Sequence, residues 1–471
     1  MKKARIPGNR LPEPDTRQPI FVHDKRFYGT FFRLSMIVAA QNLVTFSVNL
    51  ADNIMLGRYS ESTLAAAAMV NQIQFLLQMM CMSGIGMGAL VIVSQYWGKG
   101  EVEPIRRIIA LAAKFAMVIS LIFFFTSYFM PAGIVSIFTN DAVVVADGAA
   151  YLRILCFTFL TYPLEALLLS ALRGVRIVVL GTAVSIISLG TNITLNYMLI
   201  FGNWGAPELG IEGAALATLA ARVLEFLIVL FYLRLIDKKV RLRLLSFFKP
   251  DFYYLKDFVR SALPVLLSGI SWGIGMMLQV VILGHMSRGI VAANSIATTV
   301  YQVITTIAFG QVSSTNVIIG NTIGEGKLDL IRPYTRTIQV IFVLSGVVCG
   351  LLLFFVRDLV LSIYILEPAT RELAYTFISL LCIVAVFASY QYPAASGIVL
   401  GGGNTRYPVI VETSFIWLCV LPFSALSAFV WKLPAVVTFL FLKSDQFLKC
   451  IPNGIVVNRY RWVRILTRNA E

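Results

Sequence analysis

Charged residues are scarce in this sequence. They make up 13% of its 471 residues, against about 25% in soluble domains. Hydrophobic residues make up 58%, and the mean hydropathy is +0.80. Such a composition cannot supply the polar surface of a soluble globular protein, so we expect an integral membrane protein. The formal charge of +15 therefore indicates loops beside a membrane, and we expect no nucleic acid partner.

Histidine and paired cysteine are also scarce. The two histidines are His23 and His285, and the six cysteines show no CxxC spacing. We therefore expect no histidine metal centre and no disulfide framework. The sequence has no HExxH or GxxxxGK[ST] motif, and its GxSxG match, GISWG at 269–273, lies inside a long apolar segment and not at a strand-to-helix turn. These observations argue against a membrane-embedded enzyme or a nucleotide-driven pump. We expect no cofactor apart from a coupling ion, Na⁺ or H⁺.

Long apolar segments are what the sequence does have. About twelve are long enough to cross a bilayer, and they must be helices because lipid offers no partner to free backbone groups. The predicted fold class is an all-α polytopic membrane protein with two six-helix lobes. The segments are 34–56, 64–93, 108–130, 149–172, 178–201, 211–235, 261–284, 290–320, 335–356, 372–398, 408–430 and 432–450. The predicted regions are a flexible basic tail (1–30), an N-terminal lobe (31–236), a basic linker (237–258), a C-terminal lobe (259–450) and a second basic tail (451–471).

Basic residues lie mainly in the loops on one side of the predicted membrane spans. They gather in the N-terminal tail, in the central loop, in the C-terminal tail and in every second loop between spans. The loops on the other side contain only Arg58, Arg288, Arg357, Arg371 and Lys432. Basic loops stay in the cytoplasm, so both termini are predicted to be cytoplasmic in a protein of the cell membrane.

The chain also repeats itself. The segment Ile54–Val70 aligns with Val281–Ala297, and Gln95–Arg106 aligns with Asn321–Arg332. The offset between the aligned segments is 226 or 227 residues. A constant offset across several spans predicts two halves of like orientation.

One carboxylate lies inside the first apolar segment. Asp52 is flanked by Asn49 and Asn53, and a charge at membrane depth costs about 2.5–3.5 kcal/mol or more. Either Asp52 faces an interior site where it binds an ion or a proton, or it lies near enough to the membrane surface to be solvated.

Several motifs resemble those of the multidrug and toxic compound extrusion (MATE) transporters, over nearly the whole chain. They are ADNIMLGRYS at 51–60, QYWGKG at 95–100, NITLNYMLIFG at 192–202, GNTIGEGK at 320–327 and GGGNTRYP at 401–408. The resemblance implies export of amphipathic, often cationic, compounds by antiport with Na⁺ or H⁺. We expect small-molecule substrates, a bilayer environment and a monomer.

The resemblance also implies a coupling site. Asp52 matches an acidic position of the family, Asn192 and Asn196 lie four apart on one helix face, and Thr218 matches a hydroxyl position. No metal is expected other than Na⁺ at Asp52. Some family members have a second acid where this chain has Asn196, so the coupling ion stays open between Na⁺ and H⁺.

Two further acids lie within apolar segments. Glu165 and Glu412 are secondary candidates for the coupling site. The alternative for Glu165 is proximity to Arg173 or an ion pair with another base, and the alternative for Glu412 is an anchor at a helix end. Arg222 and Glu225 lie three apart and are predicted to pair with each other. Some related transporters have an acid within 263–275, but this chain has none there, which favours the first lobe for coupling.

Polar and thioether side chains mark a predicted substrate cavity. Flexible methionines adapt to varied apolar ligands, although the same residues suit plain helix packing. The candidates are Gln72, Gln78, Met79, Met82, Trp272 and Met276. A lipid-linked oligosaccharide flippase of the same superfamily is the main alternative function. It is disfavoured because basic residues at membrane depth are few, chiefly Arg153 and Arg222.

Overall fold

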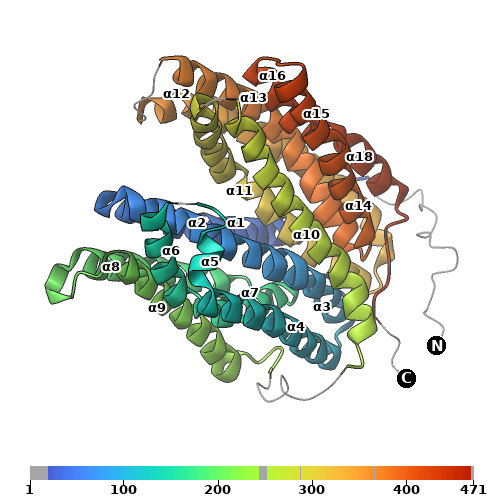
Figure 1. The fold of residues 1–471 in the computed structure, drawn as a ribbon. Helices are drawn as coiled ribbons and strands as arrows, with labels where there is room; N and C mark the ends of the chain where they lie inside the picture. The colour runs from blue at the N-terminus through green and yellow to red at the C-terminus, as the bar shows by residue number, and fades with distance from the viewer. Residues whose placement is uncertain (1–19, 140, 243–251, 287, 364–367, 468–471) are drawn as a thin grey trace. The chain divides into compact units, whose positions relative to one another are not determined.

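The protein is described here by a computed structural model, drawn in Figure 1. It describes residues 20–139, 141–242, 252–286, 288–363 and 368–467. Throughout these residues the secondary structure is helical, with no strand, as the composition predicts.

Regular α-helices account for most of the chain. They are α1 (Lys25–Tyr59), α2 (Glu61–Gln78), α3 (Met87–Lys99), α4 (Val102–Phe129), α5 (Pro131–Val135), α6 (Ala142–Leu155), α7 (Thr158–Gly174), α8 (Val179–Phe201), α9 (Gly210–Phe231), α10 (Leu255–Gly284), α11 (Arg288–Gly324), α12 (Ile331–Ile363), α13 (Pro368–Pro393), α14 (Arg406–Phe415), α15 (Leu421–Ala425), α16 (Ala435–Leu442), α17 (Ser444–Leu448) and α18 (Cys450–Arg459). Short π-helical or 3₁₀ segments join or extend them: η2 (Met79–Gly86), η3 (Asn203–Gly205), η4 (Tyr232–Ile236), η6 (Leu328–Leu330), η7 (Ala394–Val399), η8 (Ile416–Val420) and η9 (Leu426–Val430).

Ten helices of the described chain are long and apolar enough to cross a membrane. The pair α6 and α7, bent by 54° at the residues between them, makes an eleventh span if it is counted as one. The sequence predicts about twelve, and the two counts differ at 432–450. This segment is divided among α16, α17 and the start of α18, and Lys443 and Asp445 interrupt its apolar run.

The helix ends follow local chemistry. Ser60 caps α2 by accepting a hydrogen bond from the backbone N–H of Ser62, and Asp141 caps α6 through the N–H groups of Val143 and Val144. Such caps satisfy donors that have no partner inside the helix. The α13 helix gives way to the π-helical η7 directly after Pro393, because proline cannot donate a backbone hydrogen bond.

Contacts divide the chain into two compact units. Unit 2 is formed by Ala40–Val93 and Val102–Leu266. In it α8 and α9 run side by side, as do α4 and α7 (Figure 1). Its core includes Leu77, Leu152 and Phe159, all of which are fully buried.

Unit 1 is formed by Met1–Ala39, Ser94–Glu101 and Leu267–Glu471. In it α13 packs against both α11 and α12 (Figure 1). Phe377 of α13 stacks on Phe439 of α16 with ring centroids 4.1 Å apart, and this pair lies in the core of the unit.

The helices α1, α3 and α10 are each divided between the two units. The units therefore do not coincide with the first and second halves of the sequence. The first part of α1 and the end of α3 belong to unit 1, although both lie in the first half of the chain. The start of α10 belongs to unit 2. Within unit 1, Ser35 of α1 hydrogen-bonds Ser314 of α11 with 2.6 Å between their hydroxyl oxygens.

The ends of α3 and α11 meet at two glycines in unit 1. A Cβ on Gly98 would overlap the backbone carbonyl oxygen of Asn321, and a Cβ on Gly324 would overlap that of Gln95. Only glycine permits so close an approach of two backbones.

The residues after α18 form what we call the C-terminal clasp, Tyr460–Leu466. The side chain of Gln95 donates to the carbonyl oxygen of Arg464 at 3.0 Å and accepts from the N–H of Leu466 at 2.7 Å. The N–H of Arg464 donates to the carbonyl oxygen of Gly402 at 2.7 Å. Trp462, fully buried, packs against Gly402.

The predicted tails and linker are described only in part. Of the predicted tail 1–30, residues 1–19 lie outside the described residues, and α1 already begins at Lys25. Of the predicted linker 237–258, residues 243–251 lie outside, and α10 begins at Leu255. The predicted tail 451–471 contains most of α18 and the C-terminal clasp.

Candidate cation site and adjoining cavity

Asp52 lies buried on α1 in unit 2, with 8% of its surface exposed. The side-chain amide of Asn196, on α8, donates a hydrogen bond to Oδ1 of Asp52. This contact places the carboxylate in the protein interior and not at a solvated helix end.

A chain of side-chain hydrogen bonds continues from Asp52 through α8 to α9. Nδ2 of Asn196 also donates to Oδ1 of Asn192 at 3.2 Å, and Nδ2 of Asn192 donates to Oγ1 of Thr218 at 3.3 Å. The two asparagines are fully buried, and Thr218 is 6% exposed. The structure therefore brings together the four residues that the sequence grouped, because Asn192 and Asn196 share one face of α8.

The cluster is rich in oxygen. It offers a carboxylate, two amide oxygens and a hydroxyl, and the buried Tyr151 of α6 also interacts with Thr218. Oδ1 of Asn196 is buried without a hydrogen-bond partner among the described residues. A buried polar oxygen without a partner is costly, and a hard cation with oxygen ligands would satisfy it. The donor set thus fits Na⁺, and a carboxyl in the same place also fits a proton.

Arg222 of α9 connects this cluster to a neighbouring group of charges. Its Nη1 lies 2.7 Å from Oε2 of Glu225, which confirms the predicted pair, and its guanidinium lies over the ring of Tyr162, 4.9 Å from the centroid. Arg222 also interacts electrostatically with Asp52.

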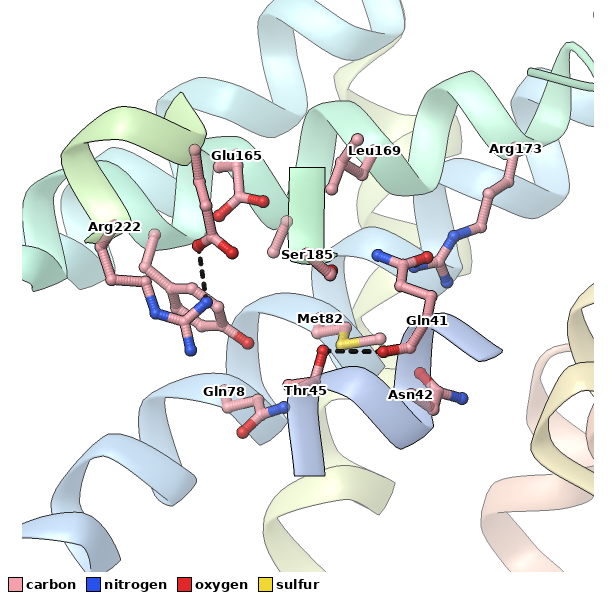
Figure 2. Close-up of a pocket in the computed structure, with 13 residues that line it drawn as sticks. Gln41, Asn42, Thr45, Gln78, Met82, Glu165, Leu169, Arg173, Ser185 and Arg222 are labelled. Carbon is pink, nitrogen blue, oxygen red and sulfur yellow. Dashed lines mark hydrogen bonds and ion pairs between the residues drawn. The ribbon is translucent and has the colours of Figure 1, made fainter. Parts of the chain in front are cut away.

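A small polar cavity of about 50 Å³ lies beside Arg222, wholly within unit 2. Figure 2 shows polar side chains of α1 facing Glu165, Leu169 and Arg173 of α7 across it. The cavity is lined by Gln41, Asn42, Thr45, Gln78, Met82, Tyr162, Glu165, Ala166, Leu169, Arg173, Ser185, Arg222 and Glu225.

The predicted substrate-cavity residues are divided between the two units. Gln78 and Met82 line this cavity, whereas Gln72 on α2 is exposed and Met79 begins η2. Trp272 and Met276 lie on the part of α10 that belongs to unit 1. Trp272 packs there against a buried apolar cluster that includes Ile416.

Glu412, the other secondary candidate, pairs with a buried base in unit 1. The ammonium of Lys449 is fully buried, 2.9 Å from Glu412 and 2.8 Å from Asp445. By sequence, Lys449 lies at the end of the last predicted span, 432–450, and reads as one of the basic residues of the cytoplasmic side. The spacing of four between Asp445 and Lys449 is the signal that could have revealed the contact.

Three polar residues of the unit 2 cavity carry no sequence signal of their own. In the sequence these are isolated polar residues: Gln41, Ser185 and Arg173. The position of Arg173 after an apolar segment predicts only a basic residue of a loop. In the structure Arg173 is 6% exposed and its Nη2 donates to Oε1 of Gln41 at 3.2 Å.

The model of the MatE family matches residues 38–198 and 264–426. The chain belongs to the MatE family. The second matched segment is shifted from the first by nearly the offset of the internal repeat. The family match therefore reproduces the two repeated halves.

Relatives in the MatE family cover most of the chain. The protein described as "Probable multidrug resistance protein NorM" of Thermotoga maritima is 22% identical over 391 residues, which is 83% of each chain. Among solved structures, MATE in the straight conformation has a TM-score of 0.82 at 17% identity and covers 92% of this chain and 95% of its own. An outward-facing MATE family transporter of the MOP superfamily also has a TM-score of 0.82, at 17% identity, with 93% and 98% covered. These structures establish the MatE fold for this chain.

Proposed function

We propose that this protein is a secondary active multidrug exporter, which moves amphipathic, cationic compounds in exchange for Na⁺ or H⁺. The observation that carries the proposal is the buried Asp52, held by the Asn196–Asn192–Thr218 chain inside a MatE fold. The names of the relatives support drug efflux as the activity.

The cluster has the chemistry of a reversible cation site. When Asp52 is ionised, the N–H group of Asn196 stabilises its charge. When a cation or a proton binds, the carboxylate is neutralised and the cost of its burial falls. A cation that binds one conformation more tightly than another shifts the equilibrium between them, and in this way an ion gradient would drive export.

The cavity charges favour drug efflux over the flippase alternative. A site for a lipid-linked pyrophosphate needs unpaired basic residues. Of the two guanidiniums that line the cavity, Arg222 is paired with Glu225 and Arg173 is bonded to Gln41. With Glu165 also present, the cavity has no excess of positive charge.

The decisive experiment is efflux from inverted membrane vesicles that contain the protein. A Na⁺ gradient and a pH gradient are imposed separately, and transport of a fluorescent cation such as ethidium is measured. Transport driven by one gradient and abolished when it is collapsed identifies the coupling ion. If neither gradient drives uptake of any tested cation, while abundance is normal, the antiport proposal fails.

We also propose that the protein is a monomer in the cell membrane with both termini in the cytoplasm. The proposal is supported by the basic residues of the terminal and central loops. Reporter fusions after Arg468 and within 237–258 should both report a cytoplasmic location, and a periplasmic or external signal from either would contradict it. The monomer proposal predicts one chain per particle when the detergent-solubilised protein is weighed by light scattering.

A further inference from the structure

The unit 2 cavity contains a second pair of acids. Glu165 of α7 and Glu225 of α9 are both buried, with 4% of each exposed, and both line the cavity. Their helices pack against each other, and the two carboxyl groups interact electrostatically. Oε2 of Glu165 is buried and has no hydrogen-bond partner among the described residues.

The charges around this pair do not balance. Three buried carboxyl groups, Asp52, Glu165 and Glu225, interact with the two guanidiniums of Arg173 and Arg222. The cavity residues contributed by α1, α2, η2 and α8 are Gln41, Asn42, Thr45, Gln78, Met82 and Ser185, none of which is charged. The only other titratable group of the cavity lining is the phenol of Tyr162. With all three acids ionised the buried ensemble therefore lacks one positive charge.

We propose that Glu165 and Glu225 share an exchangeable proton, forming a second proton-binding site beside Asp52. Two neighbouring carboxylates, buried beside one small cavity, cannot both be ionised without a large cost. A proton from cavity water bonds to Oε2 of Glu165, and the resulting O–H donates to the Glu225 carboxylate. Glu225 stays paired with Arg222, and on release the proton returns to the water.

The cavity volume selects the ligand. At about 50 Å³ it holds roughly one or two water molecules, because each takes about 30 Å³ in the liquid, and it holds no drug-sized molecule. Water in the cavity supplies the route by which a proton reaches Glu165.

Arg222 links the two sites. It contacts Glu225 directly and also interacts with Asp52, so a positive charge bound at one site reduces the attraction for a second charge at the other. The ensemble then binds one cation in either of two places. The use of this second site in transport depends on the proposed antiport function, whereas the shared proton itself does not.

The test is infrared difference spectroscopy of the purified full-length protein across a pH titration. Only a protonated carboxyl group gives the carboxylic C=O stretching band. We expect such a band in the wild type, its loss in Glu165→Gln, its retention in Asp52→Asn and its shift in frequency in Glu165→Asp, which keeps a carboxyl group. Glu212→Gln, an exposed glutamate of the same helix as Glu225, is the matched control and should leave the band unchanged.

The outcomes separate the two proposals. A band that is unchanged in Glu165→Gln overturns the second site, and so does a band that is lost only in Asp52→Asn. If Glu165→Gln does not fold, Glu165→Asp provides the test. A shifted band supports the second site, and an unshifted band overturns it. Failure of the wild type to transport in vesicles would refute the antiport proposal without changing the infrared result.

Discussion

Gly98 and Gly324 pack against each other's helices reciprocally. Gly98 faces the backbone carbonyl of Asn321, which lies three positions before Gly324. Gly324 in turn faces the backbone carbonyl of Gln95, which lies three positions before Gly98. The two glycines are separated by the offset of the sequence repeat. The internal repeat therefore produces a local two-fold contact between the end of α3 and the end of α11.

Replacing either glycine should loosen this contact. In Gly98→Ala or Gly324→Ala the new methyl group collides with a backbone oxygen, which cannot rotate away. Overpacking of this kind costs about 1–3 kcal/mol, so the melting temperature of the purified protein should fall. Gly190→Ala on α8, where no atom lies within 4 Å of the added Cβ, should melt at or above the wild-type temperature. Equal melting of all four proteins would contradict the close packing.

Removal of the charge at Asp52 should abolish coupling without unfolding the protein. Asp52→Asn keeps the size of the side chain and one hydrogen-bond acceptor for Asn196. Its membrane abundance should be normal, while gradient-driven efflux of ethidium should be lost, provided that the wild type exports ethidium. Near-normal efflux in Asp52→Asn would remove Asp52 from the mechanism. Glu212→Gln serves again as the control that keeps its activity.

Thr218 is expected to tune the affinity for the coupling ion. Thr218→Val preserves shape but removes the hydroxyl that accepts from Asn192 at 3.3 Å. One hydrogen bond contributes about 0.5–1.5 kcal/mol, so the ion concentration for half-maximal efflux should rise by roughly two- to tenfold. The measurement is efflux rate against ion concentration, with the exposed Thr194→Val of α8 as control. An unchanged half-maximal concentration would exclude Thr218 from the site.

The Glu412–Lys449–Asp445 cluster is expected to stabilise unit 1. Lys449→Met leaves two carboxylates without their shared ammonium, and breaking a buried ion pair in this way costs about 3–5 kcal/mol. Thermal melting should show a large loss of stability, or the variant should fail to accumulate in the membrane. Lys432→Met removes an exposed lysine and should have little effect. Wild-type stability of Lys449→Met would mean that the pairing contributes nothing.

Much of this architecture follows from the sequence because its signals are long or periodic. Bilayer-length apolar runs are unambiguous, and the repeat extends over several spans. The break at 432–450 was harder to foresee, because Lys443 and Asp445 read equally well as the polar end of one span. The division of α1 and α10 between the two units depends on contacts between residues far apart in the chain, such as Ser35 and Ser314, which no local pattern encodes.

The candidate site was predictable to the extent that its residues match a motif. Asp52, Asn192, Asn196 and Thr218 lie in motif segments, and the structure places them in one hydrogen-bonded chain. Glu165 was visible as a buried acid, but its neighbour Glu225 was assigned to Arg222 alone. The two acids share one cavity because α7 packs on α9, and spacing within one helix cannot reveal this.

The C-terminal clasp has a consequence for the order in which the protein is assembled during synthesis. Gln95 is translated early, but the backbone groups that it binds at Arg464 and Leu466 follow 369 and 371 positions later. Throughout most of translation the end of α3 therefore lacks its final partners, although it is already inserted. A ribosome that stops before codon 464 would release a chain with nearly all its spans and with Gln95 unsatisfied. Such a chain offers membrane quality-control proteases a mark that distinguishes it from the finished protein.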